Sequence, residues 1–179
     1  MLRRFKKKEQ KSVPMKHLHK KTMEIIIHAS SERVFEYMDN IGNTGMHMTK
    51  NSMPMMGSKL ELEQLSENAT GLNSTFWWHG KMMGFKMDFT VVATKWIKGK
   101  EKVWETVGNA QMIIMEWYQM HLMVTPDGPN TKVELSIVYT NPKNIFFKCI
   151  AFFLSPWYAN WCLTNMLNDS KQNLEKLTQ

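Results

Sequence analysis

Residues 155–179, at the C-terminal end, constrain the fold more than any other stretch of this chain. Ser155 can cap the first free N–H groups of a helix, and Pro156 suits the first helical position. A helix of this length would run for about 35 Å at 1.5 Å per residue, enough to cross a small domain. Apolar or small residues recur in it at helical spacing: Leu163, Leu167, Ser170, Leu174 and Leu177. The sequence therefore predicts one long helix with one face in a core.

Most of the preceding sequence has the alternating pattern of strands. Residues 126–130 (PDGPN) give the strongest turn signal in the chain. No helical pattern interrupts residues 74–140, so these strands are expected to pair as antiparallel neighbours. The expected strands are 22–28, 59–63, 74–81, 85–97, 102–107, 113–124 and 132–140.

Two short helices are expected between the first two strands. Ser30 suits an N-cap, and Val34, Phe35 and Met38 would form the inward side of the first helix. Residues 44–50 would form the second. The predicted fold class is therefore α+β, with an antiparallel sheet of about seven strands, two short helices after the first strand, and a long C-terminal helix.

The positive charge of the chain is concentrated at its N-terminal end. Residues 1–21 contain nine Lys/Arg and the single acid Glu9, whereas the net charge of the whole chain is +7, so residues 22–179 are nearly neutral. We expect a flexible basic arm over 1–21 and one domain over 22–179. The simplest interpretation of the arm is a solvated tail; a second is attraction to an anionic membrane, aided by Leu2 and Phe5. Nucleic-acid binding is not expected, because the rest of the chain offers no basic patch.

The cysteine and hydropathy patterns indicate the cellular compartment of the protein. Cys149 and Cys162 form no CxxC motif, so neither a disulfide framework nor a cysteine metal site is expected. The basic N-terminus lacks the apolar core of a signal peptide, and the longest apolar run, 145–154, contains Lys148 and is too short to span a bilayer. We expect a cytoplasmic protein, with a peripheral position at the inner face of the membrane as the alternative.

The order of elements resembles the START-like (SRPBCC) helix-grip superfamily, in particular its bacterial polyketide cyclase/dehydrase and lipid-transport branch. The resemblance rests on residues 24–40 (EIIIHASSERVFEYMDN), on the hairpin of residues 124–133 (VTPDGPNTKV) and on the closing helix, and it covers about residues 22–177. It implies a curved sheet that grips the long helix and leaves an apolar cavity for a lipid, a sterol, a polyketide or another hydrophobic molecule.

The composition suits such a cavity. The chain has 17 Met, 7 Trp and 9 Phe, and methionine-rich walls repack around varied ligands. The simpler alternative is that these side chains fill a core and leave no void. The predicted ligand-binding residues are Met46, Met48, Phe76, Trp78, Met87, Phe89, Val91, Trp117, Leu135 and Ile137.

A rival hypothesis is an enzyme of the cyclase/dehydratase kind, using Glu116, Tyr118 or His121 for proton transfer. Both faces of residues 113–124 are largely apolar, so the sequence leaves open which face points inward. The chain shows no HExxH motif, phosphate-binding loop or Ser-His-Asp order. We therefore expect binding without catalysis, and no cofactor.

Two further stretches have alternative interpretations. Residues 46–48 (MHM) and 53–56 (MPMM) resemble a soft-metal site, but a methionine-lined cavity mouth suits a non-exported protein better, so no metal is expected. Residues 145–154 (IFFKCIAFFL), with Trp157, are either a buried lead-in to the long helix or a surface that docks on a membrane.

Overall fold

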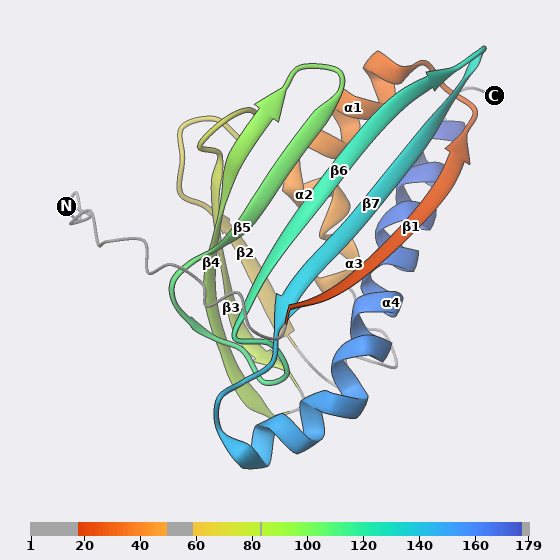
Figure 1. Cartoon of the computed structure of the whole chain (residues 1–179). Coiled ribbons are helices and arrows are strands. Elements are labelled where there is room, and N and C mark those ends of the chain that lie inside the picture. Colours follow the sequence, from red (N-terminus) through yellow and green to blue (C-terminus); the bar gives the residue numbers. More distant parts are fainter. Residues whose placement is uncertain (1–17, 50–58, 83, 177–179) are drawn as a thin grey trace.

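A single seven-stranded antiparallel sheet forms the body of the protein (Figure 1). The computed structural model describes residues 18–49, 59–82 and 84–176. The spatial order of strands is β1-β7-β6-β5-β4-β3-β2, so each strand after β2 pairs with the one before it and β7 also pairs with β1. The predicted meander of seven strands is thus confirmed. The strands are β1 His19–Ile27, β2 Lys59–Gln64, β3 Thr75–Met82, β4 Phe85–Ile97, β5 Glu101–Gln111, β6 Trp117–Asp127 and β7 Asn130–Thr140.

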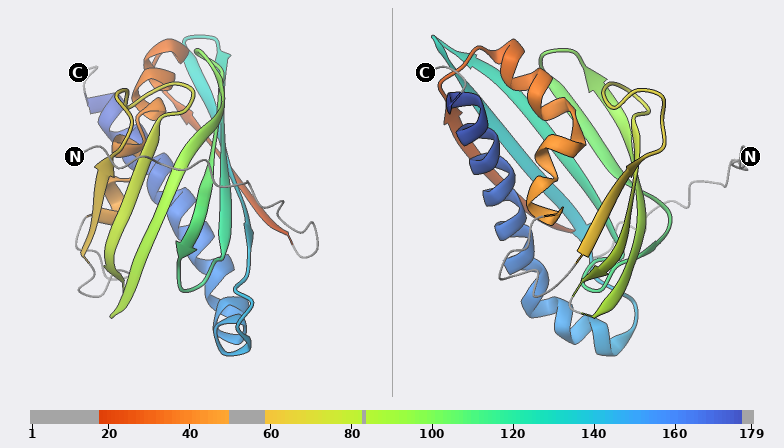
Figure 2. Two further views of the ribbon diagram at one scale, coloured as in Figure 1. Left: turned by 90° about the vertical axis from the view of Figure 1, so that its left-hand side faces the viewer. Right: turned by 180° about the vertical axis from the view of Figure 1, so that it is seen from behind.

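All the helices lie on one face of this sheet (Figure 2). The long helix α4 crosses the sheet, and three short helices lie beside it. The predicted N-cap of α1 is confirmed, because the Ser30 side chain accepts a hydrogen bond from the backbone of Arg33. The second predicted short helix forms as two single turns separated by Gly45. The helices are α1 Ser31–Asp39, α2 Ile41–Thr44, α3 Met46–Thr49 and α4 Ile145–Lys176.

The long helix begins ten residues earlier than the predicted start at Ser155. Pro156 therefore lies inside α4, where it cannot donate the backbone hydrogen bond of an interior residue, and such prolines bend helices. Figure 1 shows α4 bending after its first turns. Ser155 does not cap the helix; its hydroxyl is buried and donates to the backbone oxygen of Ile114 at 2.6 Å. None of the described helices is long and apolar enough to cross a membrane.

Two strand boundaries differ from the prediction. Strand β1 begins at His19, so Lys20 and Lys21, assigned to the basic arm, pair with β7. Strand β6 begins at Trp117 rather than at Ile113, because residues 112–116 form an irregular bend between β5 and β6. That bend brings residues 112–115 to the cavity described below.

The core lies between the concave face of the sheet and α4. Strand β4 has two register shifts against β5, and bulges of this kind bend a sheet. The predicted inward stripe of α4 is confirmed by the burial of Leu163, Leu167, Ser170 and Leu174, while Leu177 lies outside the described residues. The β6–β7 turn predicted from PDGPN is also present, with Gly128 at a positive φ of 59° that favours glycine.

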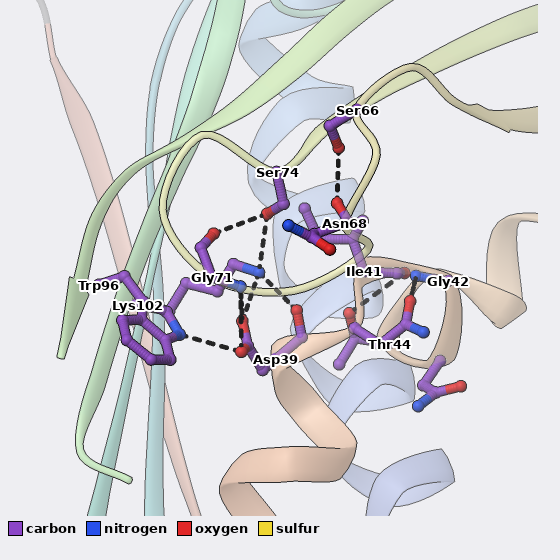
Figure 3. Close-up of polar contacts among 12 residues, drawn as sticks. Asp39, Ile41, Gly42, Thr44, Ser66, Asn68, Gly71, Ser74, Trp96 and Lys102 are labelled. Atoms are coloured by element: carbon purple, nitrogen blue, oxygen red, sulfur yellow. Dashed lines mark hydrogen bonds and ion pairs between the residues drawn. The ribbon is translucent and has the colours of Figure 1, made fainter. Parts of the chain in front are cut away.

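A buried polar network fixes the end of α1 to the sheet (Figure 3). The Lys102 ammonium, fully buried on β5, donates to both the backbone oxygen and the carboxylate of Asp39 and to Ser74 Oγ at 3.3 Å. The other carboxylate oxygen of Asp39 accepts from Trp96 Nε1 at 2.9 Å and from the Gly71 backbone at 3.2 Å. Since Asp39 ends α1 directly before α2, this network places the start of the cavity wall.

Candidate functional site

An apolar cavity of about 60 Å³ lies between the sheet and the helices. Its walls come from α2, α3, the five strands β3 to β7, the 112–115 bend and the middle of α4. Methionine is the commonest residue type in these walls. The residues that line the cavity are Ile41, Thr44, Gly45, Met48, Trp78, Met82, Met87, Phe89, Trp104, Met112, Ile113, Ile114, Met115, Tyr118, Met120, Ile137, Tyr158, Cys162 and Met166.

Half of the predicted ligand-binding residues lie on this wall: Met48, Trp78, Met87, Phe89 and Ile137. The structure places the other half elsewhere. Phe76, Val91 and Leu135 face the same core, but they are buried beyond the cavity. Met46 is partly exposed on α3, and Trp117 alternates with the inward residues of β6, so its side chain lies on the outer face of the sheet. Alternation along a strand predicts the face of a side chain, but not its position along the cavity.

Several wall residues were not predicted from the sequence. Tyr158, Cys162 and Met166 recur every four residues and so share one face of α4. This spacing lies within the predicted helix 155–179, but the stripe of leucines in the same helix is the stronger apolar pattern. Met112 and Met115 reach the cavity only because the chain bends before β6, and no sequence pattern signals that bend.

The polar groups among the residues that line the cavity include the hydroxyls of Tyr118 and Tyr158, the Cys162 thiol, and the Thr44 hydroxyl, which donates to the Ile41 backbone oxygen at 3.4 Å. Tyr118 on β6 and Tyr158 on α4 both line the cavity and both keep some accessible surface. Among the described residues, neither tyrosine hydroxyl has a hydrogen-bond partner. Burial raises the pKa of Tyr118 and of Tyr158, with the nearby Cys162 as a smaller cause. Burial also raises the pKa of the Cys162 thiol to about 12. Both tyrosines and the thiol are therefore neutral at pH 7.

The aromatic wall residues are held by their neighbours. Trp78 is almost fully buried, and its ring lies 6.4 Å from that of Phe89, which makes an edge contact with Tyr118 at 6.0 Å. A Cβ atom at Gly45 would come within 2.7 Å of the Trp78 ring and within 2.9 Å of the Ile41 oxygen. The absence of a side chain at Gly45 therefore lets the α2–α3 segment lie directly on Trp78.

The three residues of the enzymatic hypothesis are not brought together. Only Tyr118 lines the cavity. Glu116 precedes β6 and pairs with Lys143 at 2.7 Å. His121 lies on the outer face of the sheet, where its Nε2 is 2.8 Å from Glu101. The described cavity wall contains no Asp, Glu, Lys or His side chain.

Glu101 links His121 to Lys95 on this outer face. Its carboxylate accepts from Lys95 Nζ at 2.8 Å, and this hydrogen bond is the main reason why the pKa of Glu101 is lowered, with the bond to His121 as a smaller cause. A carboxyl group with a lowered folded-state pKa stabilises the fold above its unfolded pKa, and this stabilisation is lost as the pH falls.

We therefore expect the free energy of unfolding to fall in a defined pH window. The window begins at the ordinary pKa of Glu101, which is 4.5, and extends down to its lower pKa in the folded state. Glu101→Gln should reduce the slope of stability against pH in this window. Urea unfolding between pH 3 and pH 7 measures it, with Glu134→Gln as the control. Equal slopes for Glu101→Gln and the unsubstituted protein would show that the cluster does not couple to folding.

No family model matches the sequence, and no curated protein sequence matches it either. Solved structures do resemble the three-dimensional structure. The protein TTHA0849 from Thermus thermophilus superposes with a TM-score of 0.67 at 15% identity, covering 90% of this chain and 100% of that one. The Zhui aromatase/cyclase from a Streptomyces species gives 0.66 at 12% identity, over 91% and 97% of the two chains. The chain has the helix-grip fold.

A third helix-grip structure is norcoclaurine synthase from Thalictrum flavum in complex with dopamine and hydroxybenzaldehyde. It superposes with a TM-score of 0.61 at 13% identity, over 89% of this chain and 88% of that one. At these identities the likeness establishes the fold. The helix-grip architecture inferred from the sequence resemblance is thus confirmed, and the cavity lies where α4 crosses the curved sheet.

Proposed function

We propose that the protein binds a hydrophobic small molecule in the cavity between the sheet and α4, as a carrier or sensor without catalysis. The observation that carries this proposal is an apolar cavity in which two tyrosine hydroxyls, of Tyr118 and Tyr158, have no described protein partner. Apolar walls with a few convergent polar groups are typical of small-molecule sites. The apolar surface would drive binding by about 25 cal/mol for each Å² removed from water.

The small volume of the cavity implies that its wall would rearrange when a ligand binds. About 60 Å³ accommodates only a few water molecules, whereas sites for drug-sized ligands occupy about 300–1,000 Å³. A lipid or a polyketide would therefore displace wall side chains. Methionine suits this, since its unbranched side chain adopts many shapes, and Met48, Met82, Met87, Met112, Met115, Met120 and Met166 all line the wall.

The two tyrosines indicate which polar group the ligand carries. A phenol of raised pKa stays protonated at neutral pH and donates a hydrogen bond. A carbonyl or hydroxyl oxygen on an otherwise apolar molecule would accept it. The solved norcoclaurine synthase structure is a complex with dopamine and hydroxybenzaldehyde, two small aromatic molecules with polar substituents, which supports a ligand of this kind. The proposed ligand class is therefore an apolar molecule with one or two oxygen acceptors.

Native mass spectrometry of the freshly purified protein, followed by organic extraction, tests this function directly. A discrete apolar mass that copurifies with the chain is the expected result. A second arm titrates the protein with the apolar fluorophore N-phenyl-1-naphthylamine and with a fluorescent fatty acid. A bare chain that takes up neither probe would show that the cavity is a filled core, and the proposal would be abandoned.

Removing both hydroxyls should separate the polar from the apolar part of binding. The Tyr118→Phe/Tyr158→Phe variant should bind N-phenyl-1-naphthylamine within about twofold of the unsubstituted protein. It should lose roughly tenfold in affinity for the fatty-acid probe, since each lost hydrogen bond costs about 0.5–1.5 kcal/mol. Tyr139→Phe is the matched control, because Tyr139 is buried and does not line the cavity. An equal effect of the control would contradict the assignment.

Two stretches of the chain for which the sequence predicts a role lie at least partly outside the described residues. Residues 1–17 of the basic arm lie outside the described residues, so attraction of the arm to an anionic membrane stays a prediction, as does a position at the inner face of the membrane. The methionine stretch 53–56 also lies in a segment that the structure does not describe.

The cyclase-type mechanism is not proposed, because its predicted acid and base, Glu116 and His121, lie away from the cavity.

A further inference from the structure

The first half of α4 presents an apolar stripe to the solvent. Five large side chains between residues 145 and 157 are 53–74% exposed. At 3.6 residues per turn they fall within about 140° of the helix circumference, so they share one face. Exposed apolar surface that is continuous rather than scattered marks an interaction site. The stripe consists of Ile145, Phe146, Phe152, Phe153 and Trp157.

The stripe continues onto Phe85, the first residue of β4. The ring of Phe147 lies 5.6 Å from that of Phe146 and 6.2 Å from that of Phe85, and Phe85 is itself 49% exposed. We call the stripe together with Phe85 the aromatic tip. In Figures 1 and 2 the first turns of α4 project beyond the end of the strands, so a planar partner could reach them.

The charges around the aromatic tip are predominantly positive. Residues 141–168 contain Lys143 and Lys148 and no acidic residue. Lys81 and Lys86 pair across the β3–β4 hairpin beside Phe85. The neighbouring acids already have cations: Glu116 pairs with Lys143 at 2.7 Å and Asp88 with Lys86 at 3.1 Å.

The first strand, β1, begins at the same end of the sheet. His19, the first residue of β1, pairs with Tyr139, near the end of β7, and its ring accepts from Asn141 Nδ2 at 3.3 Å. Asn141 is four residues before the start of α4. The preceding residues, 1–17, contain seven Lys/Arg and one acid.

We propose that the aromatic tip docks on an anionic lipid bilayer, with the phenylalanines and Trp157 inserted at the headgroup boundary and the rim lysines Lys81, Lys86, Lys143 and Lys148 on the lipid phosphates. Exposed aromatic residues favour that boundary, and clustered lysines are attracted to anionic lipids. A protein partner would need a surface of matching shape, whereas a bilayer needs only an apolar tip with a positive rim. The docking deepens the proposed function by naming the surface at which an apolar ligand would be exchanged, and it is measurable without any ligand.

Sedimentation of the full chain with sucrose-loaded vesicles tests the docking. One vesicle set is phosphatidylcholine, and the other contains about 30% phosphatidylserine, the kind of anionic lipid that attracts lysines. The unsubstituted protein should partition more strongly to the anionic vesicles. Phe152→Ser/Phe153→Ser should lower the partition coefficient at least tenfold. The matched control is Leu72→Ser/Ile97→Ser, which removes two exposed apolar side chains from the opposite end of the sheet and should change the partition less than threefold.

Each contrary outcome overturns the docking proposal. Absence of the unsubstituted protein from both vesicle pellets would do so, and equal partition of the two double variants would assign the binding to the arm alone. Sedimentation equilibrium identifies a third outcome. If the unsubstituted protein is an oligomer and the Phe152→Ser/Phe153→Ser variant is a monomer, the aromatic tip binds a second copy of the chain instead of a bilayer. Uptake of N-phenyl-1-naphthylamine in lipid-free buffer reports the cavity separately. Normal uptake without vesicle binding rejects the docking alone, and vesicle binding without uptake rejects the proposed function alone.

Discussion

Lys102→Met should lower the free energy of unfolding by about 3–5 kcal/mol, the usual cost of removing one member of a buried ion pair. The ammonium is fully buried and its three donors reach the Asp39 backbone oxygen, the Asp39 carboxylate and Ser74. Burial lowers the pKa of Lys102, and the hydrogen bond to Asp39 opposes this shift. Methionine fills a similar volume but leaves the Asp39 carboxylate buried without a cation. Urea unfolding followed by circular dichroism measures the loss.

The control is a pair on the surface. Lys132 and Glu24 form an ion pair at 2.8 Å with side chains 45% and 49% exposed, and pairs of this kind contribute about 0–1 kcal/mol. Lys132→Met should therefore have a small effect. Asp39→Asn combined with Lys102→Met should cost less than the sum of the single changes, since neither charge then remains unpaired. A loss below about 1 kcal/mol for Lys102→Met would show that the network does not fix α1 to the sheet.

Trp78→Ala should cost about 3–5 kcal/mol, the range for a large aromatic removed from a core. Trp78 is 2% exposed and forms part of the cavity wall under Gly45. Its loss should also enlarge the cavity. If the cavity binds ligands, the folded fraction of Trp78→Ala should bind N-phenyl-1-naphthylamine more tightly than the unsubstituted protein. Urea unfolding and probe titration on the same sample give both quantities.

Trp117→Ala is the matched control for Trp78→Ala. Trp117 is a half-buried residue on the outer face of β6, so its removal should cost less stability and leave probe affinity unchanged. Trp78→Leu offers a milder change if the alanine variant does not fold. Tighter probe binding by Trp117→Ala, or no change in either Trp78 variant, would contradict the assignment of the cavity.

Local sequence patterns were sufficient to predict the architecture of the fold. The alternation of residues 85–97 predicts a strand with Met87, Phe89 and Val91 inward, and each of these is buried. Ser30 predicts the start of α1, and PDGPN predicts the β6–β7 turn. These features depend on neighbours in sequence, through side-chain period, capping and turn geometry, and such effects can be inferred from one chain.

The start of α4 was predicted wrongly because a local rule was overridden. Ser155-Pro156 has the form of a helix beginning, but the helix continues through both residues. Ser155 satisfies its hydroxyl by donating to Ile114, a residue 41 positions away. The apolar residues 145–154 therefore extend the helix past the sheet and form most of the aromatic tip. A proline costs a helix one hydrogen bond, and tertiary contacts can compensate for that cost.

The sequence by itself determined the meander, the inward faces of most strands and the long helix, because periodicity and turns are short-range properties. Only the tertiary structure decided where the cavity lies, since that depends on the bend at residues 112–116, on the curvature introduced by the β4 bulges and on the crossing point of α4. Those features place Tyr158 and Cys162 in the wall and Trp117 outside it. The facing of Tyr118 toward the cavity and of His121 away from it was likewise fixed by packing, because both faces of that strand are apolar enough to have been buried.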